Sequence, residues 1–355
     1  MFYKTKNPHG GDIYNDVIRY DFSSNSNPFG PPRSVIDAVG RSVEDIHRYP
    51  DPYCRELVNA IAGYEQVPKD YILCGNGSAE LIYSFCRAVM PGMAVETAPA
   101  FAEYSAALET VDCNVVRYEL SEDNEFEVPE DFVDFIKRQD KTPDIVFVCN
   151  PNNPTGRIVP EELLLELLAL CKEKAIRLFL DECFLRLTTT GISMASYLQE
   201  YPQLFILKAF TKSYGVPGVR LGYCLCSDSD ILEKMSLNMQ PWNVSVPAQA
   251  AGVAALSEPF YPSESAKKIA VEREWMEKQL SDIGLHVCRS DANYLLFKAP
   301  DGLDIELRKM GISIRNCNNY HGLGSGWYRT AVRLHQENQI LAEAIRECLE
   351  SVKNG

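Results

Sequence analysis

The segment that decides the fold is Lys208-Ala-Phe-Thr-Lys-Ser-Tyr-Gly-Val-Pro-Gly-Val-Arg-Leu-Gly-Tyr223. The apolar run before it, Leu204 to Leu207, is typical of a buried strand. The glycines and the proline that follow Lys212 predict a tight loop. A lysine partly buried at such a strand end can lose its proton and form a Schiff base with an aldehyde. A surface lysine in a Gly/Pro loop explains the segment equally well when it is taken alone.

The composition places the chain among ordinary globular proteins. Its 355 residues suffice for one large and one small domain, and 46% of them are hydrophobic and 24% charged. The net charge of −14 argues against a nucleic-acid or anionic-membrane partner. We find no run of about 18 apolar residues and no signal-peptide pattern, so we expect no membrane association and a cytoplasmic location.

The cysteines and histidines do not predict a metal site. The twelve cysteines are scattered without a C-x-x-C pair, and the five histidines have no ligand spacing. Most cysteines lie in apolar runs, as Cys149 and Cys171 do. We therefore expect buried, reduced thiols rather than disulfides or metal ligands.

The lysine segment resembles the cofactor-binding segment of fold-type I pyridoxal-phosphate (PLP) enzymes of the class I/II aminotransferase family. The matching residues are Thr211-Lys212, Arg220 eight positions later, and Gly222-Tyr223. The resemblance implies that Lys212 binds PLP covalently and that Thr211 and Arg220 bind its phosphate. It also implies an α/β fold, with a mostly parallel sheet in a large domain and a smaller α+β C-terminal domain.

A second segment predicts a phosphate site on physical grounds. Residues 71–82 have the pattern of a strand, a glycine turn and a helix. Glycines let the backbone approach an anion, and the free N–H groups at a helix start point toward it. This turn is similar to the family's phosphate-binding turn, which assigns Gly77, Ser78 and Ala79 to the cofactor phosphate.

Three further positions match the family's cofactor contacts. Asn153, in the dense turn Asn150 to Gly156, would hydrogen-bond the phenolic oxygen of PLP. Asp181 ends an apolar strand, where a carboxylate needs a partner, and the resemblance supplies the protonated pyridine nitrogen. Phe101 follows Pro99 and would stack on the ring, although a core aromatic is the alternative interpretation. Phe184 stands where many family members have a tyrosine, which removes one hydrogen bond to the cofactor.

The substrate side resembles, more narrowly, the L-threonine-O-3-phosphate decarboxylases of cobalamin synthesis. His9-Gly10-Gly11 and the turn containing Asn27 match an arm that closes over the site, so His9, Gly10 and Asn27 are predicted to bind substrate. Arg329 matches the family arginine that binds the substrate carboxylate through two parallel hydrogen bonds. Arg315 is our choice for a substrate phosphate, and Arg333 could equally pair with a structural carboxylate.

The resemblance also implies a homodimer with shared active sites. In the family, a tyrosine followed by proline reaches the cofactor phosphate of the partner subunit, and Tyr49 precedes Pro50 here. A solvent-facing turn is the alternative interpretation of Tyr49. We divide the chain into an arm (1–30), a large PLP-binding domain (31–245) and a small C-terminal domain (246–355).

Three functions remain open from the sequence. The first is decarboxylation of L-threonine-O-3-phosphate, which the His9 to Gly11 segment, Phe184 and the string from Arg315 to Leu323 favour. The second is a histidinol-phosphate type of aminotransferase, whose motifs overlap almost everywhere. The third is a PLP-binding module without activity, against which an intact Lys212 and Asp181 weigh.

Overall fold

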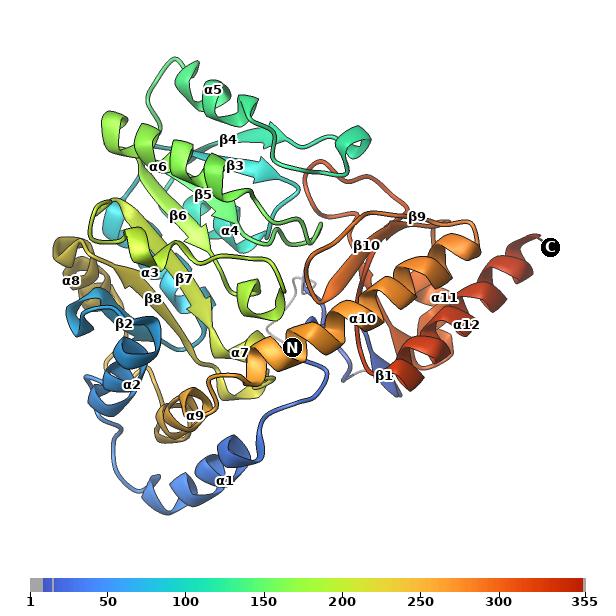
Figure 1. Ribbon diagram of the computed structural model, residues 1–355, viewed down its shortest axis with the longest axis horizontal. Coiled ribbons are helices and arrows are strands. Elements are labelled where there is room, and N and C mark those ends of the chain that lie inside the picture. The colour runs from blue at the N-terminus through green and yellow to red at the C-terminus, as the bar shows by residue number, and fades with distance from the viewer. Residues whose placement is uncertain (1–8, 15, 354–355) are drawn as a thin grey trace.

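The computed structural model describes residues 9–14 and 16–353. A larger part of the chain contains a seven-stranded sheet between layers of helices, and a smaller part lies beside it with the C-terminus (Figure 1). The large sheet is parallel except for β8, which runs antiparallel to both of its neighbours. A mostly parallel sheet between helices confirms the predicted α/β class. Its strands, in spatial order, are β2 (Ile72–Gly75), β8 (Gly222–Cys226), β7 (Leu204–Ala209), β6 (Arg177–Asp181), β5 (Ile145–Cys149), β3 (Met93–Ala98) and β4 (Asn114–Glu119).

Alternation along the strands supplies a hydrophobic layer to each face of this sheet. Val146, Leu178 and Ile206 pack in one core with residues of α2, α5, α6 and α9, whereas Phe147 and Phe179 pack in another with α3, α4 and α8. The helices of the larger part are α1 (Arg33–Ser42), α2 (Arg55–Glu65), α3 (Ser78–Val89), α4 (Glu103–Glu109), α5 (Asp131–Lys137), α6 (Glu161–Lys174), α7 (Phe210–Ser213), α8 (Ser229–Asn238) and α9 (Val246–Leu256).

The smaller part contains an antiparallel sheet covered by helices. Its strands, in spatial order, are β12 (Arg315–Asn316), β13 (Trp327–Ala331), β10 (Tyr294–Lys298) and β9 (His286–Val287). Its helices are α10 (Tyr261–Asp282), α11 (Leu303–Lys309) and α12 (His335–Lys353). The N-terminal segment joins this part, because β1 (Tyr20–Asp21) pairs in parallel with β11 (Ile312–Ser313).

Short 3-10 helices connect these elements. They are η1 (Val43–Asp45), η2 (Lys69–Tyr71), η3 (Glu122–Asn124), η4 (Leu185–Leu187), η5 (Met194–Tyr197) and η6 (Pro217–Val219). Of the predicted arm, residues 1–8 and 15 lie outside the described residues. The predicted division at 30 and 245 stays a prediction, and α9, which follows position 245, packs on α1 and α2.

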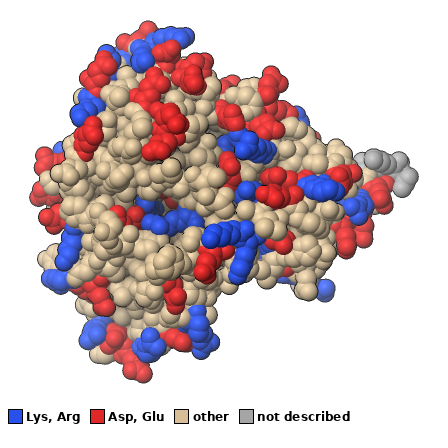
Figure 2. All heavy atoms as spheres, in the orientation of Figure 1, with Lys and Arg blue, Asp and Glu red and all other residues tan. Residues whose placement is uncertain are grey.

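The charge distribution of the surface is uneven. On the face in Figure 2, both charge signs lie around the periphery, and several Lys and Arg side chains lie across the middle. A search of the described helices for one long and apolar enough to span a bilayer finds none.

Candidate active site

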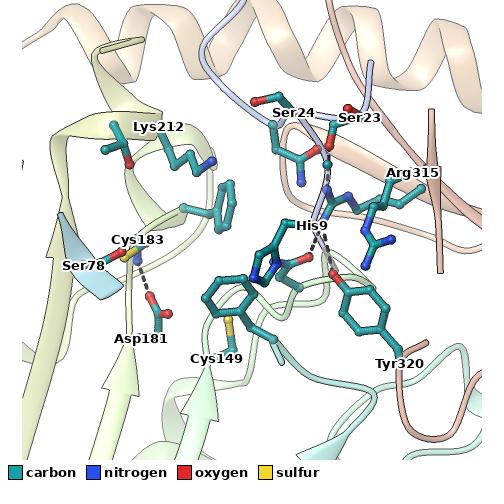
Figure 3. Close-up of a pocket in the computed structure, with 17 residues that line it drawn as sticks. His9, Ser23, Ser24, Ser78, Cys149, Asp181, Cys183, Lys212, Arg315 and Tyr320 are labelled. Atoms are coloured by element: carbon teal, nitrogen blue, oxygen red, sulfur yellow. Dashed lines mark hydrogen bonds between the residues drawn. The ribbon is translucent and has the colours of Figure 1, made fainter. Parts of the chain in front are cut away.

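A cavity of about 210 Å³ lies where β5, β6 and β7 end. These strands are parallel neighbours, so the residues that follow them meet at one edge of the sheet. In Figure 3, Lys212, Ser78 and Asp181 lie on one side of the cavity and Arg315 and Tyr320 on the other. The lining residues are His9, Gly10, Ser23, Ser24, Asn25, Ser78, Phe101, Cys149, Asn153, Asp181, Cys183, Phe184, Thr211, Lys212, Arg315, Tyr320 and Arg329.

Lys212 is held by α7, a single helical turn directly after β7. Burial, together with the nearby positive charges of Arg329 and Arg220, lowers the pKa of Lys212 to about 8. Its Nζ lies 5.6 Å from the centre of the Phe184 ring. The unprotonated amine that a nucleophile requires is therefore far more populated near neutral pH than in an ordinary lysine.

Asp181 is buried at the end of β6 and held by two donors. The Tyr104 hydroxyl donates to Oδ2 at 2.6 Å, and the Cys183 N–H donates to Oδ1 at 2.9 Å. Burial raises the pKa of Asp181, while these hydrogen bonds oppose the rise. A carboxylate in this setting gains from a cationic partner that enters the cavity.

The phosphate-site residues converge at the start of α3, which begins at Ser78 after Gly77. Ser78 and Thr211 line the cavity, whereas Gly77, Ala79 and Arg220 do not. Gly77 has a φ of +80°, and a Cβ there would lie 2.5 Å from Nη2 of Arg220. The Arg220 guanidinium thus lies against the turn, and a cation beside free helix-start N–H groups forms an anion site.

Asn153 and Arg329 lie together at the cavity wall. Nη1 of Arg329 donates to Oδ1 of Asn153, and Nη2 donates to the Ser23 carbonyl at 2.9 Å. The Nε of Arg329 is buried and has no hydrogen-bond partner among the described residues. Phe101 also lines the cavity and meets Tyr104 edge to face, with ring centres 5.7 Å apart.

Arg315 and His9, which the sequence predicts to bind substrate, both line the cavity. Arg315 donates to the Asn319 side chain at 2.7 Å and lies over the Tyr320 ring. His9 contacts the carboxylate of Glu103 through Nε2. The neighbouring Gly10 also lines the cavity. Its Cα lies so close to the Ser23 carbonyl that an added Cβ would be 2.2 Å from that oxygen.

Two of the residues considered for the substrate lie outside the lining. Arg333 pairs with Glu337 at 3.0 Å and donates to the Asp21 carbonyl. Asn27 donates from its side chain to the Ser213 carbonyl at 2.9 Å, and its N–H donates to the Lys212 carbonyl at 3.0 Å. Asn27 therefore stabilises the backbone of the turn that carries Lys212, from outside the cavity.

Asn25 is one of the lining residues that the sequence did not single out. It lines the cavity, is 2% exposed, and neither atom of its amide has a hydrogen-bond partner among the described residues. Buried amides are usually bonded, so this side chain is suited to a ligand group. The signal in the sequence was the asparagine-rich turn itself, which does not indicate which asparagine faces inward.

Tyr49 lies away from this cavity and on the surface. It is 74% exposed and stacks on Trp242 with ring centres 4.4 Å apart. It lines a second, larger hollow between α1 and α9. This position suits a residue that serves another subunit, and its role stays a prediction.

Comparison with known proteins identifies the family. The family model for aminotransferase class I and II matches residues 18–345. The chain belongs to the class I and II aminotransferase family. It is 35% identical to a threonine-phosphate decarboxylase of Salmonella typhimurium, over 94% of this chain and 92% of that protein. It is 31% identical to a histidinol-phosphate aminotransferase of Caldanaerobacter subterraneus, over 95% of each.

The solved structures agree with this assignment. The histidinol-phosphate aminotransferase of Clostridium acetobutylicum superposes with a TM-score of 0.86 at 29% identity, covering 94% of this chain and 99% of that one. The chain is therefore a PLP-dependent enzyme of the decarboxylase and aminotransferase kind.

The residues present fit PLP. The cavity contains an amine with a lowered pKa, a buried carboxylate and an aromatic face, and Ser78 connects it to the anion site at the start of α3. These features match the aldehyde, pyridine nitrogen, ring and phosphate of the cofactor. The side-chain NH2 of Asn153 remains for the phenolic oxygen, because its Oδ1 accepts from Arg329. The residue roles assigned here from the geometry stay predictions.

Proposed function

We propose that this enzyme decarboxylates L-threonine-O-3-phosphate to give (R)-1-amino-2-propanol phosphate and CO2. The observation that carries the proposal is a pair of guanidinium groups, Arg315 and Arg329, which both line the cavity that contains Lys212. In Figure 3, Arg315 lies across the cavity from Lys212. A substrate with a carboxylate and a phosphate matches two arginines, because guanidinium binds either group through paired hydrogen bonds. The 35% identity to a threonine-phosphate decarboxylase supports the same substrate.

The residues divide the work of this reaction. Arg329 binds the substrate carboxylate while its bond to Asn153 fixes its orientation. When bound, PLP supplies a ring that accepts the electron pair of the bond broken at Cα. Asp181, whose charged form accepts hydrogen bonds from Tyr104 and Cys183, would pair with the positive charge of that ring. After the C–CO2 bond breaks, the buried Lys212 in its ammonium form would donate one proton to Cα and be left as the amine.

The substrate phosphate is assigned to Arg315. We expect Arg315→Ala to lower kcat/KM for phosphorylated substrates far more than for unphosphorylated ones. Arg333→Ala is the matched control, because Arg333 pairs with Glu337 and does not line the cavity. Equal losses for both kinds of substrate would remove Arg315 from this role.

A histidinol-phosphate type of aminotransferase is the second candidate. It is favoured by the 31% identity to one such enzyme and by the TM-score of 0.86 to another. Phe184 favours the first candidate: its ring lines the cavity beside Lys212 and offers no hydroxyl to the cofactor. We take this as support for the decarboxylase.

The deciding experiment supplies L-threonine-O-3-phosphate to PLP-loaded protein without a keto acid and follows CO2. Steady release, absent from Lys212→Ala protein, is the expected result. No CO2, together with conversion of the cofactor to its amine form by histidinol phosphate, would establish the aminotransferase instead.

We also propose a cytoplasmic homodimer in which Tyr49 completes the partner's phosphate site. The exposure of Tyr49 supports a role in a partner subunit. The twelve free cysteines support a reducing compartment such as the cytoplasm. A mixture of Lys212→Ala and Tyr49→Ala proteins, unfolded and refolded together, should regain activity, because each mixed dimer has one intact site. Inactivity of verified mixed dimers would contradict shared sites.

A further inference from the structure

A buried ionic cluster lies directly behind the lysine segment. The Lys208 ammonium is 3.0 Å from Oε2 of Glu65, 3.1 Å from Oε2 of Glu182 and 2.9 Å from the Ser193 hydroxyl. The side chains of Lys208 and Glu65 are each 4% exposed, and that of Glu182 is fully buried. Arg186 joins the cluster through Glu65 at 2.7 Å. None of these residues lines the active-site cavity.

The carboxylates of the cluster accept further hydrogen bonds. Glu182 accepts from the Ser193 hydroxyl at 2.6 Å and from the Met194 N–H at 2.9 Å. Burial alone would raise the pKa of Glu65, but Lys208 and Arg186 lower it to about 2. The cluster thus contains two carboxylates, Glu65 and Glu182, and two basic side chains, Lys208 and Arg186. Buried ion pairs often add little net stability, so a cluster of this kind calls for another explanation.

The cluster connects the two segments that carry the proposed cofactor residues. Glu182 directly follows Asp181, and Lys208, near the end of β7, precedes Lys212 by four positions. Besides the ion pair, the Glu182 N–H donates to the Leu207 carbonyl at 2.9 Å. Asp181 lines the cavity, whereas the Glu182 carboxylate binds Lys208 and Ser193. A side-chain bond and a backbone bond thus fasten the end of β6 to the end of β7.

We propose that the Lys208–Glu182 ion pair is a positioning device that fixes Lys212 relative to Asp181 and so sets the tilt of the bound cofactor. The inference rests on the proposed roles of Lys212 and Asp181. The cluster acts through geometry, because its charges balance in number. The charges that most affect Lys212 belong instead to other residues, chiefly Arg329.

The test compares Lys208→Met, Glu182→Gln and the double variant in PLP-loaded protein. Visible circular dichroism per bound cofactor reports cofactor tilt, an absorbance titration reports the local field, and a melting curve reports stability. We expect both single variants to change the dichroism in the same direction and to lower kcat at least about tenfold with little change in KM. The double variant should be no worse than either single one, because both disrupt one interaction.

Other outcomes would overturn the proposal. Opposite shifts of the absorbance titration in the two single variants would mean that the charges act through their field. A lower melting temperature with unchanged dichroism and kcat would mean a purely structural role. Lys298→Met is the matched control, since Lys298 makes an exposed ion pair with Glu122 at 3.1 Å.

Two further measurements keep the test decisive. If Lys208→Met does not fold, Lys208→Arg replaces it: the charge is kept while the donors move, so a changed dichroism supports positioning and an unchanged one contradicts it. Failure of the underlying assignment is recognised separately, because Lys212→Ala would then keep the visible absorbance. The dichroism needs no turnover, so it remains informative whichever substrate is correct.

Discussion

Replacement of Tyr104 by phenylalanine removes one hydrogen bond to the Asp181 carboxylate. It tests how far this bond stabilises the charged form of Asp181. The hydroxyl donates to Oδ2 at 2.6 Å, and the other bonded donor is the Cys183 N–H at 2.9 Å. Tyr104 is 1% exposed, so water does not replace the lost bond. A hydrogen bond to a charged group contributes about 1.5–3 kcal/mol, which is roughly 10- to 100-fold in an equilibrium.

The direction of the effect follows from the chemistry of a carboxylate. Burial already raises the pKa of Asp181, and loss of a donor to the charged form raises it further. The charged form is therefore lost at a higher pH as the solution is acidified. We expect PLP binding by Tyr104→Phe to fail earlier on the acid side and to be about 10- to 100-fold weaker there than in the wild type.

The assay is the dissociation constant of PLP, measured by absorbance between about pH 5 and pH 8. Tyr328→Phe is the matched control: Tyr328 is also 1% exposed, and its hydroxyl bonds the Gly302 N–H at 3.0 Å, away from the cavity. The control should follow the wild-type curve. An acid limb of Tyr104→Phe that coincides with the wild type would refute the role given to this bond.

Three other predictions concern the same site. Apo protein should capture added PLP faster as the pH rises through about 8, because the pKa of Lys212 is lowered to about 8 and only the unprotonated amine reacts; stopped-flow rates that do not change over this range would contradict it. Gly77→Ala should weaken PLP retention on dialysis, because its Cβ would lie 2.5 Å from Nη2 of Arg220; Gly30→Ala, with a similar φ of +70° and open space, is the control, and equal retention in both would argue against the phosphate turn. Asn25→Ala should raise KM for the substrate while PLP affinity stays within about twofold, and an unchanged KM would remove Asn25 from the substrate site.

The order of strands and turns was predictable because the apolar runs are clear. The turn that begins at Asn150, then Asp181, and finally Lys212 each follow such a run, and parallel strands bring their carboxyl ends together. The apolar runs placed these residues at strand ends, and the resemblance to the family predicted the α/β class. The phosphate turn was predictable from local sequence too, because its glycines mark a backbone shape that leaves no room for larger side chains.

The missed features depend on contacts between distant segments. Glu65 and Lys208 are 143 positions apart, and charged residues of this kind usually lie on a surface. Asn25 and Asn27 lie in one irregular turn whose packing against Asn293 and Ser213 decides which of them faces the cavity. Neither fact follows from local pattern, because periodicity predicts faces of regular elements only.

The most direct test of the account is the visible spectrum of PLP-loaded Lys212→Ala protein. Lys212 is the amine buried in the cavity with its pKa lowered to about 8, and the account assigns the covalent bond to the cofactor to this residue. The wild type should show the absorbance of lysine-bound PLP, and the variant should lose it while remaining folded. A folded variant that keeps the wild-type spectrum would contradict the assignment of the site.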